Sequence, residues 1–462
     1  MKLRHTSAGL AAVGLFSFTI SCGKSSSSGS APSPSATTSS GVEAAVAASA
    51  SALASAAPSA PPPQAPAAPL NVLLLTVDSL RADMPWTGYS RPIAPNLSKL
   101  AERSTLYTNA YSASSYTAKS VATLLSGRYP STLYRDGYFF AKYSAANHFL
   151  AEILSERGVR TIGWHSHLYF GKGKGLEQGF AAWQLVPGIT FDPETDNHVT
   201  SDKMTALGME LLGSKDNTSG QFFAWAHYMD PHDKYNKHPE SPDFGNKGRD
   251  RYDSEVWFAD FWLGKLLAWA ETQPWWKNTV VIVSADHGEA FGEHGMYKHA
   301  FEVWEVLTRV PLMIAGPGIR AQRIEQRRSH IDLAPTVLEL MGVPVPAEFQ
   351  GKSLVPELRG QPPESREPIL VELTEDSHNP PRRALLRGEY KIIDFGRSKF
   401  QLYDLRSDPG ELKDLAKERP EELTRMRQLL DERYKTLPTV EPYGGATLKE
   451  GGSARGPVGP AK

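Results

Sequence analysis

The stretch NVLLLTVDSLRAD, residues 71–83, decides the fold, because an unbroken apolar run ends there at a carboxylate, Asp78. A continuous apolar run of this kind is typical of a strand that is buried on both faces of a parallel sheet. Four further runs have the same character: RTIGWHS from Arg160, QFFAWAHYM from Gln221, TVVIVSA from Thr279 and PLMIAG from Pro311. We therefore expect a large, mostly parallel sheet.

Helical patterns separate these strands. Apolar residues recur at three-and-four spacing in the segments PNLSKLAERS (95–104), AANHFLAEILSERG (145–158) and DRYDSEVWFADFWLGKLLAWAE (250–271). Strands that alternate with helices predict an α/β fold, with helices covering both faces of the sheet. Ligands of such folds bind beyond the carboxyl ends of the strands, which is where Asp78 is expected to lie.

Composition limits the class of protein. The 462 residues carry 50 basic and 51 acidic side chains, a formal net charge of -1, so the sequence lacks the basic footprint of a nucleic-acid-binding protein. Hydrophobic residues make up 40% of the chain, which is enough for a large core. Thirteen histidines accompany a single cysteine, which excludes zinc ribbons and leaves sites built from His and Asp open.

The two ends of the chain differ from its centre. Residues 1–22 combine Lys2 and Arg4 with a short apolar run and then Ser-Cys-Gly around Cys22. This pattern predicts a lipoprotein-type signal with Cys22 as the lipid anchor; a plain cleaved signal peptide with an incidental cysteine is the alternative. Residues 23–69, rich in Ser, Ala and Pro, are expected to form a disordered tether, and 442–462 a disordered tail. We therefore expect a bacterial envelope protein, periplasmic or at the cell surface.

Polar clusters follow three of the predicted strands. Asp78 follows the first, HYMDPHDKY (227–235) contains the second cluster, and SADHGEAFGEHGMYKH (284–299) contains the third. A single Asp after a strand is usually a cap, and a single His is usually packed. Three clusters at the strand ends of one sheet instead indicate a shared site. For His227, which lies inside its apolar run, we favour the role of a core histidine whose hydrogen bonds are satisfied.

These segments resemble a known family. TVDSLRAD (76–83), LLSGRYP (124–130) and SADHGEAFGEHG (284–295) match, in order, the metal-site motifs of sulfatases in the alkaline phosphatase superfamily. Its downstream signatures are similar to RVPLMIAGPGI (309–319), HIDLAPTVLELMGVPVPAEFQGKSL (330–354) and FQLYDLRSDPGELKDLA (400–416). The resemblance implies an α/β/α sandwich, catalytic over residues 70–365, followed by a smaller C-terminal subdomain with an antiparallel sheet over 366–441.

The resemblance also implies a divalent metal held by Asp78, Asp286, His287 and the nucleophile. Counting from Gly127, the nucleophile position is Thr117, where the family has a cysteine that becomes formylglycine. A threonine hydroxyl next to a metal can form a covalent ester, and the start of a helix favours a bound anion. The role of helix N-cap is the alternative for Thr117, and the two roles are compatible.

Three departures from the family pattern affect the chemistry. Without cysteine, formylglycine cannot form. Lys119 and Val121 replace the Pro and Arg of the motif. Two interpretations of Lys119 stay open: it supplies the missing cation, or it is a solvated helix residue. Ser79 stands where sulfatases have a second Asp, which shifts the expected metal from calcium towards manganese or zinc, although calcium stays possible.

Threonine as nucleophile favours phosphate over sulfate esters, because a phosphothreonine can be attacked again by water or by an acceptor alcohol. By the resemblance, His232 and His299 contact the ester oxygens and protonate the leaving group, with Lys298 as the weaker candidate next to His299. The leading hypothesis is a metal-dependent hydrolase or transferase acting on a small-molecule, glycan or lipid ester. The alternatives are an inactive binding module for anionic glycans and a true sulfatase that uses Thr117 directly.

Overall fold

The computed structural model describes residues 69–190 and 199–444. Three predicted segments lie outside these ranges: the signal with Cys22, nearly all of the tether, and residues 445–462 of the tail. The expectations about them stay predictions. Among the helices within the described ranges, none is both long enough and apolar enough to cross a bilayer.

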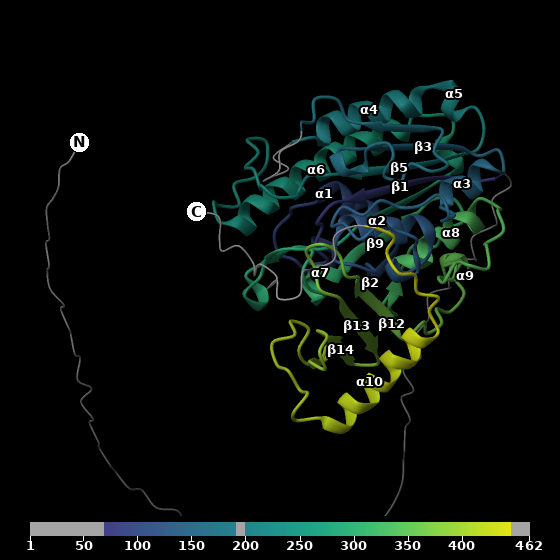
Figure 1. Cartoon of the computed structure of the whole chain (residues 1–462). Coiled ribbons are helices and arrows are strands. Elements are labelled where there is room, and N and C mark those ends of the chain that lie inside the picture. Colours follow the sequence, from purple (N-terminus) through teal and green to yellow (C-terminus); the bar gives the residue numbers. More distant parts are fainter. Residues whose placement is uncertain (1–68, 191–198, 445–462) are drawn as a thin grey trace, which may run out of the picture. The chain divides into compact units, whose positions relative to one another are not determined.

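A large mixed sheet forms the centre of the described chain (Figure 1). Its strand order is β10-β2-β9-β6-β1-β5-β3-β4, with β11 also paired to β2. The strands β6, β1, β5, β3 and β4 are parallel neighbours, whereas β9 runs antiparallel to both β6 and β2. The strand bounds are β1 Asn71–Val77, β2 Thr105–Tyr111, β3 Arg160–His165, β4 Ala182–Leu185, β5 Phe222–Tyr228, β6 Thr279–Ala285, β9 Arg309–Ala315, β10 Gln322–Ile324 and β11 Arg328–Ser329.

Two layers of helices cover this sheet. One layer contains α1 (Pro95–Glu102), α4 (Ser201–Gly213), α5 (Lys215–Thr218) and the long α6 (Gly248–Ala270). The other contains α2 (Thr117–Ser126), α3 (Leu150–Ser155), α8 (Leu333–Leu340) and α9 (Val355–Leu358). Every residue of β1, β5 and β6 is buried, as expected for strands covered on both faces. The predicted α/β class is therefore confirmed.

The helix α2 ends at a glycine for a steric reason. Gly127 has φ 62°, a left-handed conformation, and its N–H donates to the carbonyl oxygen of Thr123. A Cβ at this position would lie 2.8 Å from Cδ2 of Phe349. The backbone conformation and the close contact both require glycine, which accounts for the Gly of the LLSGRYP motif.

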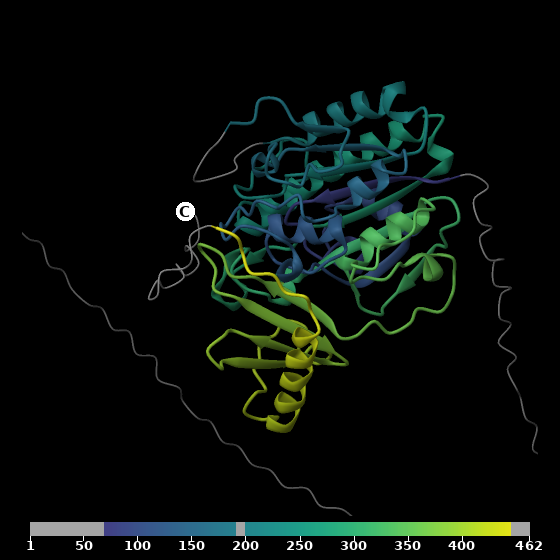
Figure 2. The same cartoon turned by 45° about the vertical axis from the view of Figure 1, so that its right-hand side comes forward.

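A second, antiparallel sheet follows, with the order β12-β13-β14-β15. Its strands are β12 Ile369–Leu373, β13 Arg382–Arg387, β14 Tyr390–Asp394 and β15 Phe400–Asp404, and α10 (Pro420–Lys435) packs along it (Figure 2). Met426 and Leu430 of α10 are buried against apolar residues of this sheet. The predicted C-terminal antiparallel sheet is thus confirmed. Further short elements include α7 (Glu305–Thr308) and the hairpin of β7 (Ala290–Phe291) and β8 (Tyr297–Lys298).

Candidate active site

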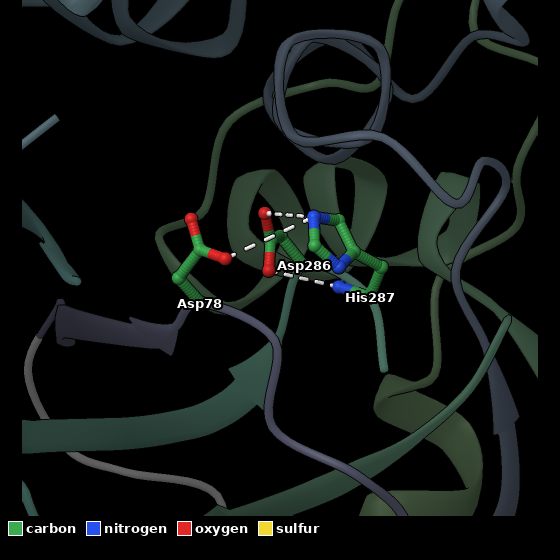
Figure 3. Close-up of side chains that lie close together, drawn as sticks. All are labelled: Asp78, Asp286 and His287. Carbon is green, nitrogen blue, oxygen red and sulfur yellow. Dashed lines mark hydrogen bonds and ion pairs between the residues drawn. The ribbon is translucent and has the colours of Figure 1, made fainter. Parts of the chain in front are cut away.

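The pairing of β1 with β6 brings two carboxylates together. Val77 and Ala285 are register partners at the carboxyl ends of these parallel strands, so that Asp78 and Asp286 emerge side by side. His287 follows directly. All three side chains are buried, and each offers a possible metal-ligand atom within 4.8 Å of the others (Figure 3). The three predicted metal ligands that follow strands therefore lie together.

The contacts within this trio leave one oxygen without a hydrogen bond. Nε2 of His287 lies 3.3 Å from Oδ2 of Asp286 and 3.9 Å from Oδ1 of Asp78. Oδ1 of Asp286 accepts hydrogen bonds from the backbone N–H groups of Ser79 and His287, but the buried Oδ2 accepts none. A buried carboxylate oxygen without a donor is costly unless a cation binds it. The trio consequently fits a divalent metal ion.

The electrostatics of the trio support this fit. Burial and the charge of Asp78 raise the pKa of Asp286 well above its ordinary value. Burial also acts to raise the pKa of Asp78, but His232, His227 and His287 outweigh it and hold that pKa well below its usual range. Burial lowers the pKa of His287, so its ring stays neutral and keeps a lone pair for a metal. A bound divalent cation would allow both carboxylates to ionise.

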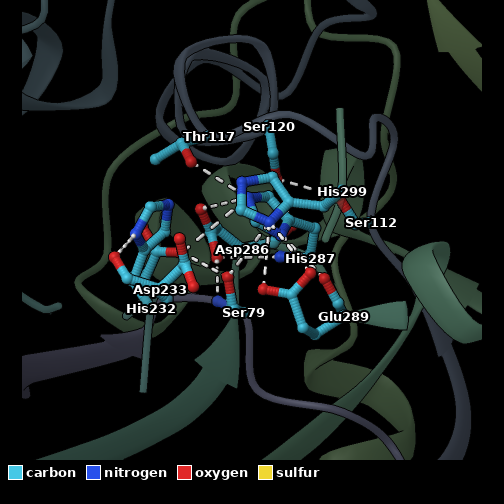
Figure 4. A network of polar contacts seen from close by, with 12 residues as sticks. Ser79, Ser112, Thr117, Ser120, His232, Asp233, Asp286, His287, Glu289 and His299 are labelled. Atoms are coloured by element: carbon cyan, nitrogen blue, oxygen red, sulfur yellow. Dashed lines mark hydrogen bonds and ion pairs between the residues drawn. The ribbon is translucent and has the colours of Figure 1, made fainter. Parts of the chain in front are cut away.

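Thr117 completes the group as the first residue of α2. Its Oγ1 lies 2.9 Å from Nε2 of His287, and the residue is buried (Figure 4). The helix N-cap is Tyr116, so Thr117 does not have the alternative role of N-cap. Ser120, one turn along, donates a 2.6 Å hydrogen bond to the carbonyl oxygen of Asp286 and thereby ties α2 to the end of β6.

His227 has two roles at once. Its Nδ1 lies 2.9 Å from Oγ1 of Thr76 and its Nε2 lies 3.2 Å from Oδ2 of Asp78, so the buried ring is satisfied on both sides, as expected. The second contact also makes His227 a residue that orients Asp78. Ser79 orients the same carboxylate, because its hydroxyl donates to Oδ1 of Asp78 at 2.8 Å.

The predicted proton donors lie next to the trio. The ring of His299 is centred 4.1 Å from that of His287 and 5.1 Å from that of His232. Nδ1 of His299 lies 3.2 Å from Oε2 of the buried Glu289. Burial acts to lower the pKa of His299, but Glu289 outweighs it and raises that pKa. His299 can therefore carry a proton near neutral pH.

Lys298 lies at the rim of the site. Its side chain is about half exposed, and its Nζ is 2.8 Å from Oδ2 of Asp233, the residue after His232. This ion pair connects the loop after β5 with the hairpin of β7 and β8, the two segments that supply His232 and His299. Asp233 was not singled out in the sequence analysis, although its position directly after His232 in the DPHD segment indicated that it lies at the site.

Lys119 has its polar partners outside the trio. Its Nζ donates to Oδ2 of Asp376 at 2.5 Å and to the carbonyl oxygen of Thr374 at 2.6 Å, and the residue is 1% exposed. Within the described chain, none of its hydrogen bonds or ion pairs involves the metal-site residues. The expectation that Lys119 is a solvated helix residue is wrong, because the C-terminal loop after β12 supplies a buried carboxylate for it. Its role as the catalytic cation stays a prediction.

Comparisons with known proteins identify the family of the chain. Residues 70–343 match the Sulfatase family, and residues 292–438 match the family described as N-sulphoglucosamine sulphohydrolase, C-terminal. The choline-sulfatase of Rhizobium meliloti is 25% identical over 425 residues, which cover 75% of this chain and 82% of that protein. The Delta 4,5-hexuronate-2-O-sulfatase of Bacteroides thetaiotaomicron is 35% identical over 151 residues, 31% of each chain.

Solved structures share the fold. A 2-O GAG sulfatase superposes with a TM-score of 0.69 at 22% identity, covering 84% of this chain and 99% of that one. The phosphonate monoester hydrolase of Agrobacterium radiobacter superposes with a TM-score of 0.64 at 20% identity, covering 79% and 96%. The Sulfatase match spans more than half of the 462 residues. The chain belongs to the sulfatase family.

Proposed function

We propose that this chain is a metal-dependent ester hydrolase in which Thr117 is the nucleophile, and that it cleaves phosphate esters, diesters above all, faster than sulfate esters. One observation carries the proposal: the Thr117 hydroxyl lies 2.9 Å from Nε2 of His287, beside two buried carboxylates that together with His287 offer ligand atoms for a metal. The same geometry is compatible with transfer to an acceptor alcohol in place of water.

The metal would be held by Asp78, Asp286, His287 and Thr117, with manganese or zinc favoured. A divalent ion at this position would lower the pKa of the Thr117 hydroxyl and offset charge on the ester oxygens. Thr117 loses its hydroxyl proton to solvent and its oxygen attacks phosphorus. The bond to the leaving alcohol breaks, and His232 or His299 gives that alcohol its proton. Water then attacks the phosphorus on Thr117 and returns a proton to the histidine, while the Thr117 oxygen leaves and takes up a proton from solvent. A diester substrate thus releases a phosphate monoester in this second step, and a monoester substrate releases inorganic phosphate.

The preference for phosphate esters rests on two sulfatase groups that this chain lacks, the cysteine and the arginine of the nucleophile motif. Position 117 has no cysteine, and the ammonium of Lys119, which would have to take the place of the family's arginine, is paired with Asp376. A sulfothreonine would lack the aldehyde route by which formylglycine enzymes expel sulfate. The names of the relatives point to sulfate esters, and one structural neighbour is a phosphonate monoester hydrolase, so both ester classes belong in the test.

The substrate class and the cellular location are part of the proposal. Related proteins are named for choline sulfate and for sulfated uronic acids and glycosaminoglycans, which supports a small-molecule or glycan ester as substrate. Lipidation of Cys22 would place the enzyme in a bacterial envelope. If Cys22→Ala left both signal processing and membrane association unchanged, the proposed lipid anchor at Cys22 would be wrong.

The test is a substrate panel. Nitrophenyl sulfate, nitrophenyl phosphate and bis-nitrophenyl phosphate are assayed with manganese, zinc and calcium. We expect turnover that is fastest on the diester, abolished in Thr117→Ala and partly kept in Thr117→Ser, since the hydroxyl remains. Thr424→Ala, at an exposed threonine of α10, is the matched control and should behave as wild type.

Two results would end the proposal. Activity of Thr117→Ala equal to that of wild type would place the nucleophile elsewhere. Absence of turnover with every metal, together with binding of anionic glycans, would identify the chain as an inactive binding module. Addition of manganese or zinc should also raise the melting temperature of the wild type but not that of Asp286→Asn.

A further inference from the structure

A pocket lies beside the C-terminal sheet. It has a volume of about 470 Å³ and is lined by the loop at residues 131–137, the end of β12, the start of β13 and the segment after α10. Arg135, Arg383 and Tyr434 face this pocket. Its volume is in the range of small-molecule sites. None of the residues assigned to the candidate active site lines it.

Arg135 is a buried arginine whose hydrogen bonds are incomplete. The residue is 4% exposed, and its Nη1 donates to the carbonyl oxygens of Leu133 at 3.1 Å and Val440 at 3.4 Å. Within residues 69–190 and 199–444, its Nε and Nη2 donate to no partner, and no carboxylate forms an ion pair with it. Neither atom is among the fully buried polar atoms without a partner, so both reach the solvent of the pocket, where they are available to the oxygens of a ligand.

The free donors of Arg135 have a defined geometry. The guanidinium is planar, and its Nε–H and one Nη2–H point the same way along one edge. This edge forms two parallel hydrogen bonds with a carboxylate, sulfate or phosphate group. The two backbone carbonyls on Nη1 fix the opposite side of the group, so the free edge is already oriented.

The acidic residues of the pocket do not supply this partner. Glu372 accepts hydrogen bonds from the backbone N–H of Ser131 and from the hydroxyl of Tyr434, and Asp376 forms its ion pair with Lys119. Glu375 and Glu441, which also line the pocket, are exposed to solvent.

A second cation lies at the rim of the pocket. The guanidinium of Arg383 is centred 3.8 Å from the ring of Tyr434 and, in the part of the chain that the structure describes, forms no hydrogen bond or ion pair. Arg382, the remaining arginine of the lining, is instead paired with Glu302.

We propose that this pocket binds a small molecule through an oxyanion, a carboxylate, sulfate or phosphate group, which is held by the free edge of Arg135 with Arg383 at the rim. This inference does not depend on Thr117 or on the proposed hydrolysis. The ligand is either a free inorganic anion or a sugar acid, and both present the same oxygens to Arg135.

The test is calorimetric titration of the full chain with sodium sulfate, sodium phosphate and sodium glucuronate at constant ionic strength. We expect Arg135→Gln to weaken binding of at least one of these probes tenfold or more and Arg383→Gln to weaken it severalfold. Arg387→Gln changes an exposed arginine of the same strand β13 that does not line the pocket, and it should leave binding unchanged. Thr117→Ala should also bind as wild type, which separates this pocket from the active site.

The three probes distinguish an inorganic ion from a sugar acid as the ligand. Binding of sulfate or phosphate alone identifies an inorganic ion, whereas tight binding of glucuronate alone identifies a sugar acid. The proposal is overturned if the wild type binds none of the three probes, or if Arg135→Gln binds them as tightly as wild type. Should Arg135→Gln not fold, Arg383→Gln decides, and unchanged affinity in that variant refutes the site.

Discussion

Removing either partner of the buried Lys119–Asp376 pair should destabilise the protein, and by unequal amounts. Both side chains are almost completely buried, at 1% and 2% exposure. Lys119 has two acceptors, Asp376 and the carbonyl oxygen of Thr374. Asp376 has more donors, because the backbone N–H groups of His378 and Asn379 and the side-chain amide of Asn379 also reach it.

This difference sets the order of the two effects. Asp376→Asn removes the negative charge and leaves a buried ammonium that faces only neutral groups, and we expect a loss of about 3–5 kcal/mol in the free energy of unfolding. Lys119→Met leaves a carboxylate that keeps its other donors, and the expected loss is smaller, about 2–3 kcal/mol. The double variant leaves no unpaired charge, so its loss should fall short of the sum by about 1 kcal/mol or more.

Urea unfolding followed by tryptophan fluorescence measures the wild type, the two single variants and the double variant at one pH. Lys203→Met removes an exposed lysine from the surface of α4, so it serves as the matched control and should unfold as the wild type does. Additive losses in the double variant, or a larger loss for Lys119→Met than for Asp376→Asn, would refute the reasoning.

Two further predictions concern the pH dependence and the backbone of the site. Burial lowers the pKa of His330 from 6.5 to about 3, so the unfolded chain takes up a proton that the folded chain does not as the pH falls below 6.5. The stability should therefore decrease by about 2 kcal/mol between pH 7.5 and pH 5 through this group, and a His330→Gln variant should lack that part of the loss in urea titrations. A Cβ on Gly288 would lie 2.1 Å from the carbonyl oxygen of Val306, so Gly288→Ala should displace His287 and abolish the metal-induced rise in melting temperature. Gly220→Ala, where a Cβ meets nothing within 4 Å, should retain that rise, and an unchanged response in Gly288→Ala would contradict this account.

The sequence predicted the central strands well because their signal is local. The runs at 71–77 and 279–285 coincide with β1 and β6, since strands buried on both faces are apolar throughout. The helix predicted within 145–158 is shorter, Leu150–Ser155, because the side chain of Asn147 binds the carbonyl oxygens of Tyr134 and Ser144 and holds a turn before it. The strand β2 was missed, because polar residues interrupt its apolar pattern.

The candidate site was predictable where its residues follow a strand directly. Asp78, Asp286 and His287 are positioned by the backbone register of two neighbouring strands, and the apolar runs show where each strand ends. The environment of Lys119 was not predictable, because its partner comes from another sheet and is 257 positions away. Neither composition nor local spacing indicates a contact of that kind.

The Lys119–Asp376 contact has a consequence for how the chain is made. A ribosome adds about 5–20 residues per second, so the 257 positions between the partners correspond to roughly 13–50 seconds of synthesis. During that time all of the metal-site residues have been added, but the ammonium of Lys119 still lacks its carboxylate. In a chain that ends at residue 365, before the C-terminal sheet, the Lys119 ammonium would never gain the carboxylate of Asp376. The C-terminal sheet is therefore not a separable appendage: the first turn of the helix that carries Thr117 is completed only when the loop after β12 has been synthesised.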